Sequence, residues 1–508
     1  MSSEISAIDY HQETKHTPQS VKGGGGLNFD NKPRLYKLYE DLPSISLDDS
    51  IPEPSMSALR AIAEQPANDT NTIDRETLAG LCYYAAGITK TIHRRDHEHE
   101  FRAAACTGAL YHIDLYPVCG DLEDLDAGVY HYDPRSDSLE LLRKGDYRKV
   151  LADASNDPTI EEAPVTFIAT STWWRNAWKY KARTYRHAFW DSGTILANLL
   201  ATASTRNLPA KVVVGFADEP IANLLGIDPE WEAPLELVPV GAGDPVPDSP
   251  DMTAVEPIDL STEPLVSDPK EYPLIYQAWQ GSTLSNGTTA REWRHSGNRP
   301  INGRGQGEGD RIDLTPVGSE RASNRPLYNT IQRRGSCREY ERDELSFRKF
   351  STVLDRATRG VPIDVRDNNG RALQFVDCYC IVNGVENIES GAYQYYPDVN
   401  TLERLHVGKY RQEAKRLALG QRLGGDAAVC VYFMADLDAV TDVLGDRGYR
   451  AAQLEAALTA GRMYLATYAH RDLGGTGLTF FDDLVTEFFE PRTRGQTPMF
   501  LYTFGRPD

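Results

Sequence analysis

The pattern of hydrophobic and polar positions divides the chain into four parts. Residues 1–69 are polar, dotted with Pro, Ser and Asp, and include four consecutive glycines, which predicts an arm without a core of its own. Residues 70–241 and 329–508 alternate helical and strand-like periodicities and end in the strand-like segments APLELVPVG and MFLYTFG. Residues 242–328 are rich in Pro, Gly, Asp and Asn and predict a linker, in which IYQAWQ could pack as a short helix. The pattern therefore predicts two α+β domains joined by a linker.

Two segments of the chain repeat each other. AGVYHYDPRSDSLELLRKGDYR at 127–148 aligns without gaps on SGAYQYYPDVNTLERLHVGKYR at 390–411, and ten of the 22 positions are identical. Further along, TYRHA at 184–188 matches GYRAA at 448–452. Such a repeat indicates two copies of one α+β domain. Fused copies predict an intramolecular pseudo-dimer, in which each half replaces one subunit of a homodimer.

Charge and cysteine content exclude several classes of protein. The chain has 54 basic and 74 acidic residues, a net charge of -20, which argues against a nucleic acid as the main partner. Its seven cysteines are scattered without paired CxxC units, so we predict neither a disulfide framework nor a zinc site. The tract HRRDHEHE at 93–100 lacks a complete ligand set and is interpreted as a solvated loop, so we predict no metal. Neither a membrane-length apolar run nor a signal-peptide pattern occurs, which predicts a cytoplasmic protein without a membrane partner.

A basic segment, RRGSCREY, opens the second domain. Its guanidinium groups and hydroxyl converge on one stretch of extended chain, a combination that suits a phosphate group. The residues concerned are Arg333, Arg334, Ser336 and Arg338. A solvated basic turn explains the same string without a ligand, and both interpretations stay open on this string alone.

The first domain contributes two further candidates. In RAAACTGALYHIDLYPV, Cys106, Thr107 and Gly108 form a small-residue turn whose amides can approach a flat or anionic ligand, although a tight turn without a ligand is the commoner explanation. Lys179 and Tyr180 are adjacent in an aromatic segment, where the ammonium group can lower the pKa of the phenol and make it a general base. The alternative is an amphipathic helix whose lysine reaches solvent while its tyrosine packs. The second copy lacks both features.

Together these strings resemble the nitroreductase superfamily, and within it the SagB/ThcOx-type FMN-dependent dehydrogenases associated with azole formation in ribosomal peptides. The resemblance rests on LCYYAAGITK, RAAACTGALYHIDLY, AGVYHYDP and WRNAWKYKARTYRHAFWDSGTILANLL in the first copy and on RRGSCREY and LGGTGLTFFDD in the second. It implies a homodimer-like fold with FMN at the interface, here a pseudo-dimer of two tandem nitroreductase-like domains.

The resemblance also implies which residues bind FMN. The expected phosphate ligands are Arg334, Ser336 and Arg338, with Arg333 and Arg506 as weaker additions. The residues expected around the flavin ring come from both halves and are Gly477, Leu478, Cys106, Thr107 and Gly108. The turn departs from the usual Pro-Ser-Ala-Gly of the family, because here it reads Ala-Cys-Thr-Gly. Since the basic segment occurs only in the second copy and the turn only in the first, we expect one complete site and one empty twin.

The Lys-Tyr pair of the azoline dehydrogenases matches Lys179 and Tyr180. We expect Tyr180, assisted by Lys179, to remove a proton from a thiazoline- or oxazoline-like ring while a hydride passes to FMN, with dioxygen as the final oxidant. Two other functions stay open: a generic NAD(P)H-dependent nitro- or quinone reductase, and a flavin-free scaffold that binds a peptide or a partner enzyme. The substrate class is a small molecule or a peptide, and the resemblance implies a cyclodehydratase as a partner.

Overall fold

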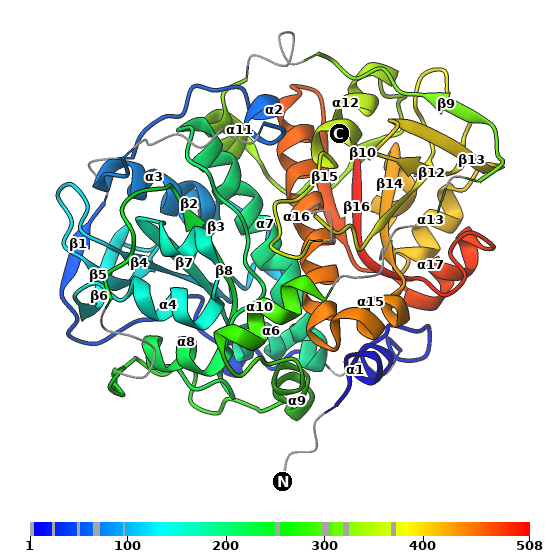
Figure 1. Cartoon of the computed structure of the whole chain (residues 1–508). Coiled ribbons are helices and arrows are strands. Elements are labelled where there is room, and N and C mark those ends of the chain that lie inside the picture. Colours follow the sequence, from blue (N-terminus) through cyan, green and yellow to red (C-terminus); the bar gives the residue numbers. More distant parts are fainter. Residues whose placement is uncertain are drawn as a thin grey trace.

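Two long helices form the centre of the molecule. The computed structural model describes residues 5–22, 26–47, 51–64, 72–94, 97–248, 255–296, 305, 307–318, 325–366 and 372–508. Within it, α7 (Thr184–Thr205) packs against α16 (Arg447–Ala469). Figure 1 shows one β-sheet on each side of this helix pair, that of the first half on the left and that of the second half on the right. The two sheet-containing halves confirm the predicted α+β fold class with tandem domains.

The sheet of the first half has the strand order β1-β6-β5-β4-β7-β8, and every neighbouring pair is antiparallel. The strands are β1 (Ser44–Ser46), β4 (Ile113–Cys119), β5 (Gly128–Asp133), β6 (Ser138–Lys144), β7 (Val165–Thr172) and β8 (Glu232–Val240). One face packs on α7 and the other on α4 (Arg148–Ser155) and α8 (Asp218–Leu225). Because both faces are covered, β4, β5, β7 and β8 are buried along their whole length.

The sheet of the second half has the order β10-β16-β14-β11-β12-β13-β9, and β15 pairs with β16. The strands are β9 (Arg311–Asp313), β10 (Tyr340–Glu341), β11 (Asp377–Val382), β12 (Gly391–Tyr396), β13 (Thr401–Val407), β14 (Val429–Ala435), β15 (Gly474–Leu478) and β16 (Thr497–Pro507). All of these pairs are antiparallel as well.

Shorter helices cover the two sheets and the central pair. They are α1 (Ala7–Glu13), α2 (Ala58–Ala61), α3 (Arg75–Ala86), α5 (Pro158–Glu161), α6 (Trp173–Tyr180), α9 (Pro273–Gly281), α10 (Gly287–His295), α11 (Leu327–Arg333), α12 (Phe347–Ala357), α13 (Arg411–Leu417), α14 (Arg422–Asp426), α15 (Leu437–Leu444) and α17 (Asp482–Phe489). Helix α9 confirms the short helix expected at IYQAWQ. Within the described ranges, no helix combines the length and the apolar composition that crossing a membrane requires.

The repeated sequence forms the same hairpin in both halves, β5–β6 and β12–β13. Each hairpin has a register shift at the corresponding place, between Val129 and Tyr130 in one and between Ala392 and Tyr393 in the other. The two tyrosine hydroxyls donate to a carbonyl four residues earlier, each at 2.7 Å. The repeat is therefore structural as well as sequential.

Small residues let the two central helices approach closely. A Cβ atom added to Gly193 would lie 2.6 Å from Cβ of Ala457, and one added to Gly461 would lie 2.6 Å from Cβ of Ala197. Across the same contact, Nε1 of Trp190 donates to Oε1 of Gln453 at 2.7 Å. The halves thus pack through backbone-to-backbone contact that larger side chains would prevent.

Two buried ion clusters join the halves, and each is the image of the other. In both, a carboxylate that begins a helix of one half accepts hydrogen bonds from two arginines at the start of the central helix of the other half. The clusters are Asp482 with Arg183 and Arg186, and Asp218 with Arg447 and Arg450. Corresponding residues differ by 264 in number, which fixes the alignment of the two central helices. Each buried carboxylate thus has two guanidinium partners, which offsets the cost of burying the charges.

Helices α1 and α9 occupy equivalent places around these clusters. Arg186 donates to the carbonyl of His11, at the end of α1, while Arg450 donates to the carbonyl of Trp279, at the end of α9. Helix α1 lies in the predicted arm and α9 in the predicted linker, and both take part in the interface between the halves.

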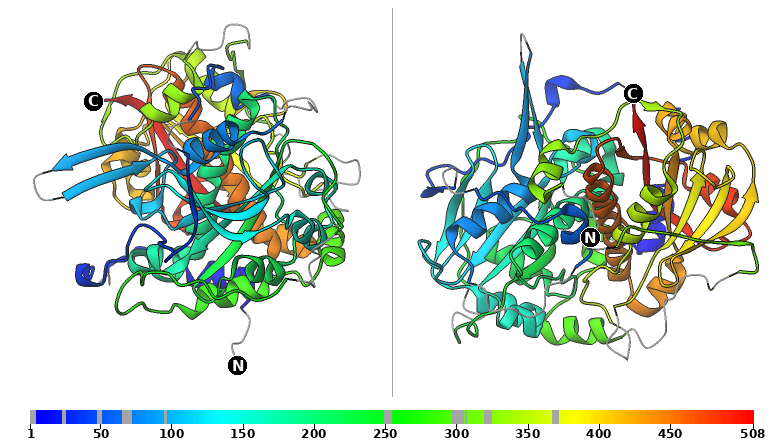
Figure 2. Two further views of the ribbon diagram at one scale, coloured as in Figure 1. Left: turned by 90° about the vertical axis from the view of Figure 1, so that its left-hand side faces the viewer. Right: turned by 90° about the horizontal axis from the view of Figure 1, so that it is seen from above.

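A hairpin projects from the first half beside the central helices. Strands β2 (Ile88–Arg94) and β3 (His97–Arg102) form it, and Figure 2 shows it standing away from the body of the molecule. The interpretation of HRRDHEHE as a loop is therefore wrong for residues 93–94 and 97–100, which are strand, and residues 95–96 lie outside the described ranges. The tract is solvent-exposed at His93 and Glu98, and Nδ1 of His93 lies 2.8 Å from Oε1 of Glu98 on the facing strand.

Candidate active site

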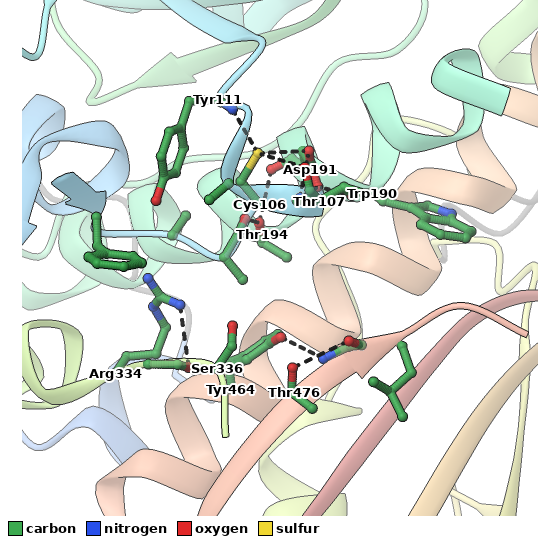
Figure 3. A pocket seen from close by; sticks show the side chains of 18 of the residues that line it. Cys106, Thr107, Tyr111, Trp190, Asp191, Thr194, Arg334, Ser336, Tyr464 and Thr476 are labelled. Carbon is green, nitrogen blue, oxygen red and sulfur yellow. Dashed lines mark hydrogen bonds between the residues drawn. The ribbon is translucent and has the colours of Figure 1, made fainter. Parts of the chain in front are cut away.

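A cavity of about 710 Å³ lies where the two halves meet. The first half contributes the base of the β2–β3 hairpin, the turn at 104–109, the end of α6 and one side of α7. The second half contributes residues 332–336, β15 and the start of α14. The volume falls in the range of about 300–1,000 Å³ that is common for small-molecule sites. Figure 3 shows the two walls, with Cys106, Thr107 and Asp191 on one and Arg334, Ser336 and Tyr464 on the other.

The cavity brings together eleven of the twelve residues that the sequence singled out. These are Cys106, Thr107, Gly108, Lys179, Tyr180, Arg333, Arg334, Ser336, Arg338, Gly477 and Leu478. Arg506 is not among the lining residues: it lies near the end of β16, and its guanidinium group pairs with Asp343 at 3.0 Å.

The turn of the first half requires its glycine. Gly108 has a φ of +66°, in the left-handed region that side chains other than glycine rarely adopt. A Cβ atom there would also lie 2.8 Å from the hydroxyl of Tyr180 and 3.4 Å from Nζ of Lys179. The turn and the Lys-Tyr pair are therefore in close contact, although some 70 residues separate them in the sequence.

The Lys-Tyr pair does not have the electrostatics expected from its sequence. Nζ of Lys179 lies over the ring face of Tyr180, 5.1 Å from its centroid, and no hydrogen bond joins the two side chains among the described contacts. Burial raises the pKa of Tyr180, and the nearby Asp191 carboxylate raises it further. The expectation of a lowered phenol pKa is therefore wrong. Burial also lowers the pKa of Lys179, and the guanidinium group of Arg338 lowers it further.

His187 also lines the cavity, although no pattern in the sequence singled it out. Its ring meets that of Tyr180 edge to face, with centroids 4.6 Å apart, and its Nδ1 lies 3.0 Å from Oδ1 of Asn176. Burial holds the pKa of His187 well below its usual range, with Arg183 lowering it further. The imidazole is therefore neutral at pH 7. Tyr180 is the last residue of α6 and His187 lies in α7, so their contact depends on how these two helices pack.

Two of the four residues in the basic segment are already engaged. Arg334 donates to the carbonyls of Arg102 and Ala103, which connects the second half to the strand before the turn of the first half. Arg333 donates to three carbonyls at the end of α16, where the helix dipole favours a cation. Among the described contacts, Ser336 and Arg338 form no hydrogen bond or ion pair, so these two are free for a ligand.

The wall formed by β15 offers further polar groups. The backbone amide of Gly477 donates to the hydroxyl of Tyr464 at 2.6 Å, and Leu478 continues the lining. The hydroxyl of Thr479, the next lining residue, is buried without a hydrogen-bond partner. A buried hydroxyl at a cavity wall is available to a ligand. Among the described residues, no group of His, Cys, Asp and Glu side chains has the arrangement of a metal site.

The counterpart of the turn in the second half falls largely on residues 367–371, which lie outside the described ranges. The expectation of an empty twin site therefore stays a prediction.

Comparison with known proteins identifies the first half. The model of the nitroreductase family matches residues 58–242. This part of the chain belongs to the nitroreductase family. Proteins of that family typically bind a flavin.

Three relatives place the chain further. A protein named as a candidate nitroreductase, MJ1384 of Methanocaldococcus jannaschii, is 26% identical over 189 residues, which are 35% of this chain and 90% of the relative. The microcin B17-processing protein McbC of Escherichia coli is 26% identical over 134 residues, 25% of this chain, and the match spans about half of McbC (49%). The crystal structure of a candidate nitroreductase from Anabaena variabilis matches over 100% of both chains, with a TM-score of 0.78 and 24% identity.

These matches confirm the expected nitroreductase superfamily, and the similarity to McbC supports its SagB-type branch. The match to the Anabaena variabilis structure extends over both halves, so the two-sheet architecture is shared as a fold. The nitroreductase-family domain at 58–242 and these relatives support an oxidoreductase enzyme.

Proposed function

We propose that the protein is an FMN-dependent dehydrogenase that oxidises an azoline-like ring, with one site per chain. The observation that carries this proposal is the cavity of about 710 Å³ in which the turn and Lys-Tyr pair of one half face the basic segment and β15 of the other. Each half contributes what the other lacks.

The residues of the cavity fit FMN. The guanidinium group of Arg338 lowers the pKa of Lys179 across the cavity and has no anionic partner of its own among the described residues. A phosphate group would supply that missing negative charge. Ser336 and Arg338 would hold the phosphate, and Arg334 would keep the basic segment in place through its bonds to the first half. Gly477, Leu478 and the unpaired hydroxyl of Thr479 would contact the ring.

Two residues of the chain would orient the substrate and accept the proton that it loses. When bound, FMN supplies the hydride acceptor of the dehydrogenation. The raised pKa of Tyr180 keeps its phenol protonated at neutral pH, so its hydroxyl can donate a hydrogen bond to the substrate. The lowered pKa of Lys179 favours the neutral amine, which can accept the proton that leaves the ring carbon. Lys179 is therefore the better candidate for the base, and Tyr180 orients the substrate beside it.

The similarity to McbC suggests a peptide as the substrate, because that relative processes microcin B17. A cyclodehydratase that forms the azoline ring would then supply the substrate. Similarity to MJ1384 over 90% of its length favours a second candidate, a flavin-dependent nitroreductase. Such an enzyme needs NAD(P)H and does not depend on Lys179.

Substitution of the pair tests the proposal. Lys179→Ala and Tyr180→Phe are expected to leave FMN bound while lowering the rate of azoline oxidation by about 100-fold or more, the usual contribution of a proton-transfer residue. The measurement is single-turnover bleaching of the flavin absorbance by a thiazoline peptide. Bleaching at the parent rate in both variants would refute the assigned roles, and bleaching only by NAD(P)H would favour the nitroreductase.

A further inference from the structure

A buried carboxylate on α7 lies directly behind the turn that lines the cavity. Asp191 is 3% exposed, and His112 is its only ion-pair partner among the described residues. Its oxygens accept from the backbone amide of Thr107 at 2.9 Å, the hydroxyl of Thr107 at 2.7 Å and the thiol of Cys106 at 3.0 Å, and lie 2.9 Å from Nε2 of His112. Figure 3 shows the bonds of Cys106 and Thr107 converging on the Asp191 side chain.

The backbone of the turn needs support from its surroundings. Gly108 and Ala109 have positive φ, 66° and 52°, and backbone in such regions keeps its conformation only where neighbouring contacts hold it. The amide of Ala109 donates to the carbonyl of Cys106 at 3.1 Å, and the hydroxyl of Thr194 donates to the carbonyl of Ala105 at 2.6 Å. Asp191 adds the hydrogen bonds that hold Cys106 and Thr107.

The central helix of the other half carries a similar buried acid. Glu455 on α16 corresponds to Asp191, since the two central helices align with a shift of 264 residues. Its carboxyl group accepts from the backbone amides of Phe375 at 2.7 Å and Val376 at 3.0 Å. Glu455 does not line the cavity. A buried acid that holds a neighbouring segment is thus common to both halves, but only the first-half copy supports a site.

We propose that Asp191 is the positioning residue of this site: it fixes the turn so that the turn's backbone and the adjacent Tyr180 hydroxyl face the ligand. The contact between Gly108 and Tyr180 transmits the effect, because a shift of the turn removes the surface against which the phenol lies. The identity of the ligand rests on the proposed function, whereas the hold of Asp191 on the turn does not.

Matched variants of the full-length protein test this proposal with two readouts. Asp191→Ala removes the carboxylate that accepts from Cys106 and Thr107. Glu455→Ala makes the equivalent loss in the other half, and Thr107→Val removes one hydrogen bond without changing the helix. One readout is amide hydrogen exchange of a peptide covering 103–111 in the ligand-free protein. The other is the Kd of FMN, from quenching of its fluorescence.

Asp191→Ala is expected to speed exchange of the turn by about tenfold and to raise the Kd of FMN by about tenfold, the effect of losing one or two charge-assisted hydrogen bonds. Thr107→Val should change both by about threefold. Glu455→Ala should leave both within about twofold of the parent, even if it lowers the melting temperature by as much as Asp191→Ala does.

Unchanged exchange and Kd in Asp191→Ala would overturn the proposal, as would an equal weakening of FMN binding in Glu455→Ala. If Asp191→Ala does not fold, Thr107→Val decides by the same criteria. A parent protein that binds no FMN would refute the proposed function alone, because exchange of the turn would still show whether Asp191 holds it.

Discussion

Burial decides the charge states of the individual residues in this cavity. Adjacency in the sequence suggested that Lys179 would lower the pKa of Tyr180, but the lysine lies over the ring and the phenol is buried beside a carboxylate. The same burial, together with Arg338, acts on Lys179 in the direction that makes it a base. A sequence cannot show these directions, since they depend on which groups the fold brings within a few ångströms.

The rate of substrate oxidation should rise with pH as Lys179 loses its proton. Burial and Arg338 lower the pKa of Lys179. The increase in rate should therefore occur at a lower pH than that at which a free lysine titrates. Arg338→Gln removes one of the two causes and should shift the rise to higher pH. The measurement is kcat against pH from 6 to 10 at saturating FMN. A profile in Arg338→Gln that coincides with that of the parent would show that Lys179 is not the titrating base.

Gly108→Ala should weaken FMN binding by about tenfold or more, since the new methyl group meets both backbone strain and the hydroxyl of Tyr180 at 2.8 Å. Gly360 is the matched control, because it has a similar φ of +68° and open space around its missing Cβ. Gly360→Ala should cost about 1 kcal/mol of stability and leave the Kd of FMN unchanged. Equal Kd values for the two variants would contradict the packing of the turn against Tyr180.

Two buried glutamates should make stability depend on pH. Burial raises the pKa of Glu236 and of Glu455 from an ordinary value of 4.5 to about 8. The folded state therefore binds more protons than the unfolded state, and stability should fall as pH rises from about 5 through 8, on the order of a few kcal/mol for each group. Melting temperatures of the parent and of Glu236→Gln between pH 5 and 9 test this. The melting temperature of Glu236→Gln should fall less with rising pH than that of the parent. An identical fall in both proteins would show that Glu236 does not contribute to the pH dependence of stability.

Among the elements, the repeated segments and the short helix α9 were predictable from the sequence, but the place of α1 and α9 at the interface between the halves was not. The repeat at 127–148 and 390–411 identified β5–β6 and β12–β13 because their strands keep similar residues. Helices α1 and α9 share their place but no evident sequence, because each only presents carbonyl and hydroxyl groups to an arginine. Backbone carbonyls leave no sequence signal, so these helices were placed in an arm and a linker.

The two ion clusters should be equally important to stability. Asp218→Ala and Asp482→Ala each leave two buried guanidinium groups without their carboxylate, which is expected to cost about 3–5 kcal/mol. The control is Glu413→Ala, which removes a surface pair with Arg416 and should cost under about 1 kcal/mol. Urea unfolding of the three variants measures this. A loss below about 1 kcal/mol in either cluster variant would show that the cluster does not hold the halves together.

At the scale of the whole molecule, both halves contribute residues to one cavity. The sequence predicted this division, because the basic segment and the turn occur in different copies. It did not predict that Arg333 and Arg334 bond to backbone carbonyls, or that Asp191 and His187 stand behind the turn and the phenol. Those contacts depend on how the elements of each half pack, and the bonds of Arg334 depend on how the two halves pack together.

The ratio of FMN to protein chain tests the central claim most directly. Full-length protein saturated with FMN and freed of excess ligand should contain one FMN per chain, by flavin absorbance after denaturation against amino-acid analysis. Lys179→Ala should keep this ratio, and Ser336→Ala combined with Arg338→Gln should lower it. Two FMN per chain would contradict the asymmetric pair of halves, and no bound FMN would contradict the assignment of the cavity as a flavin site.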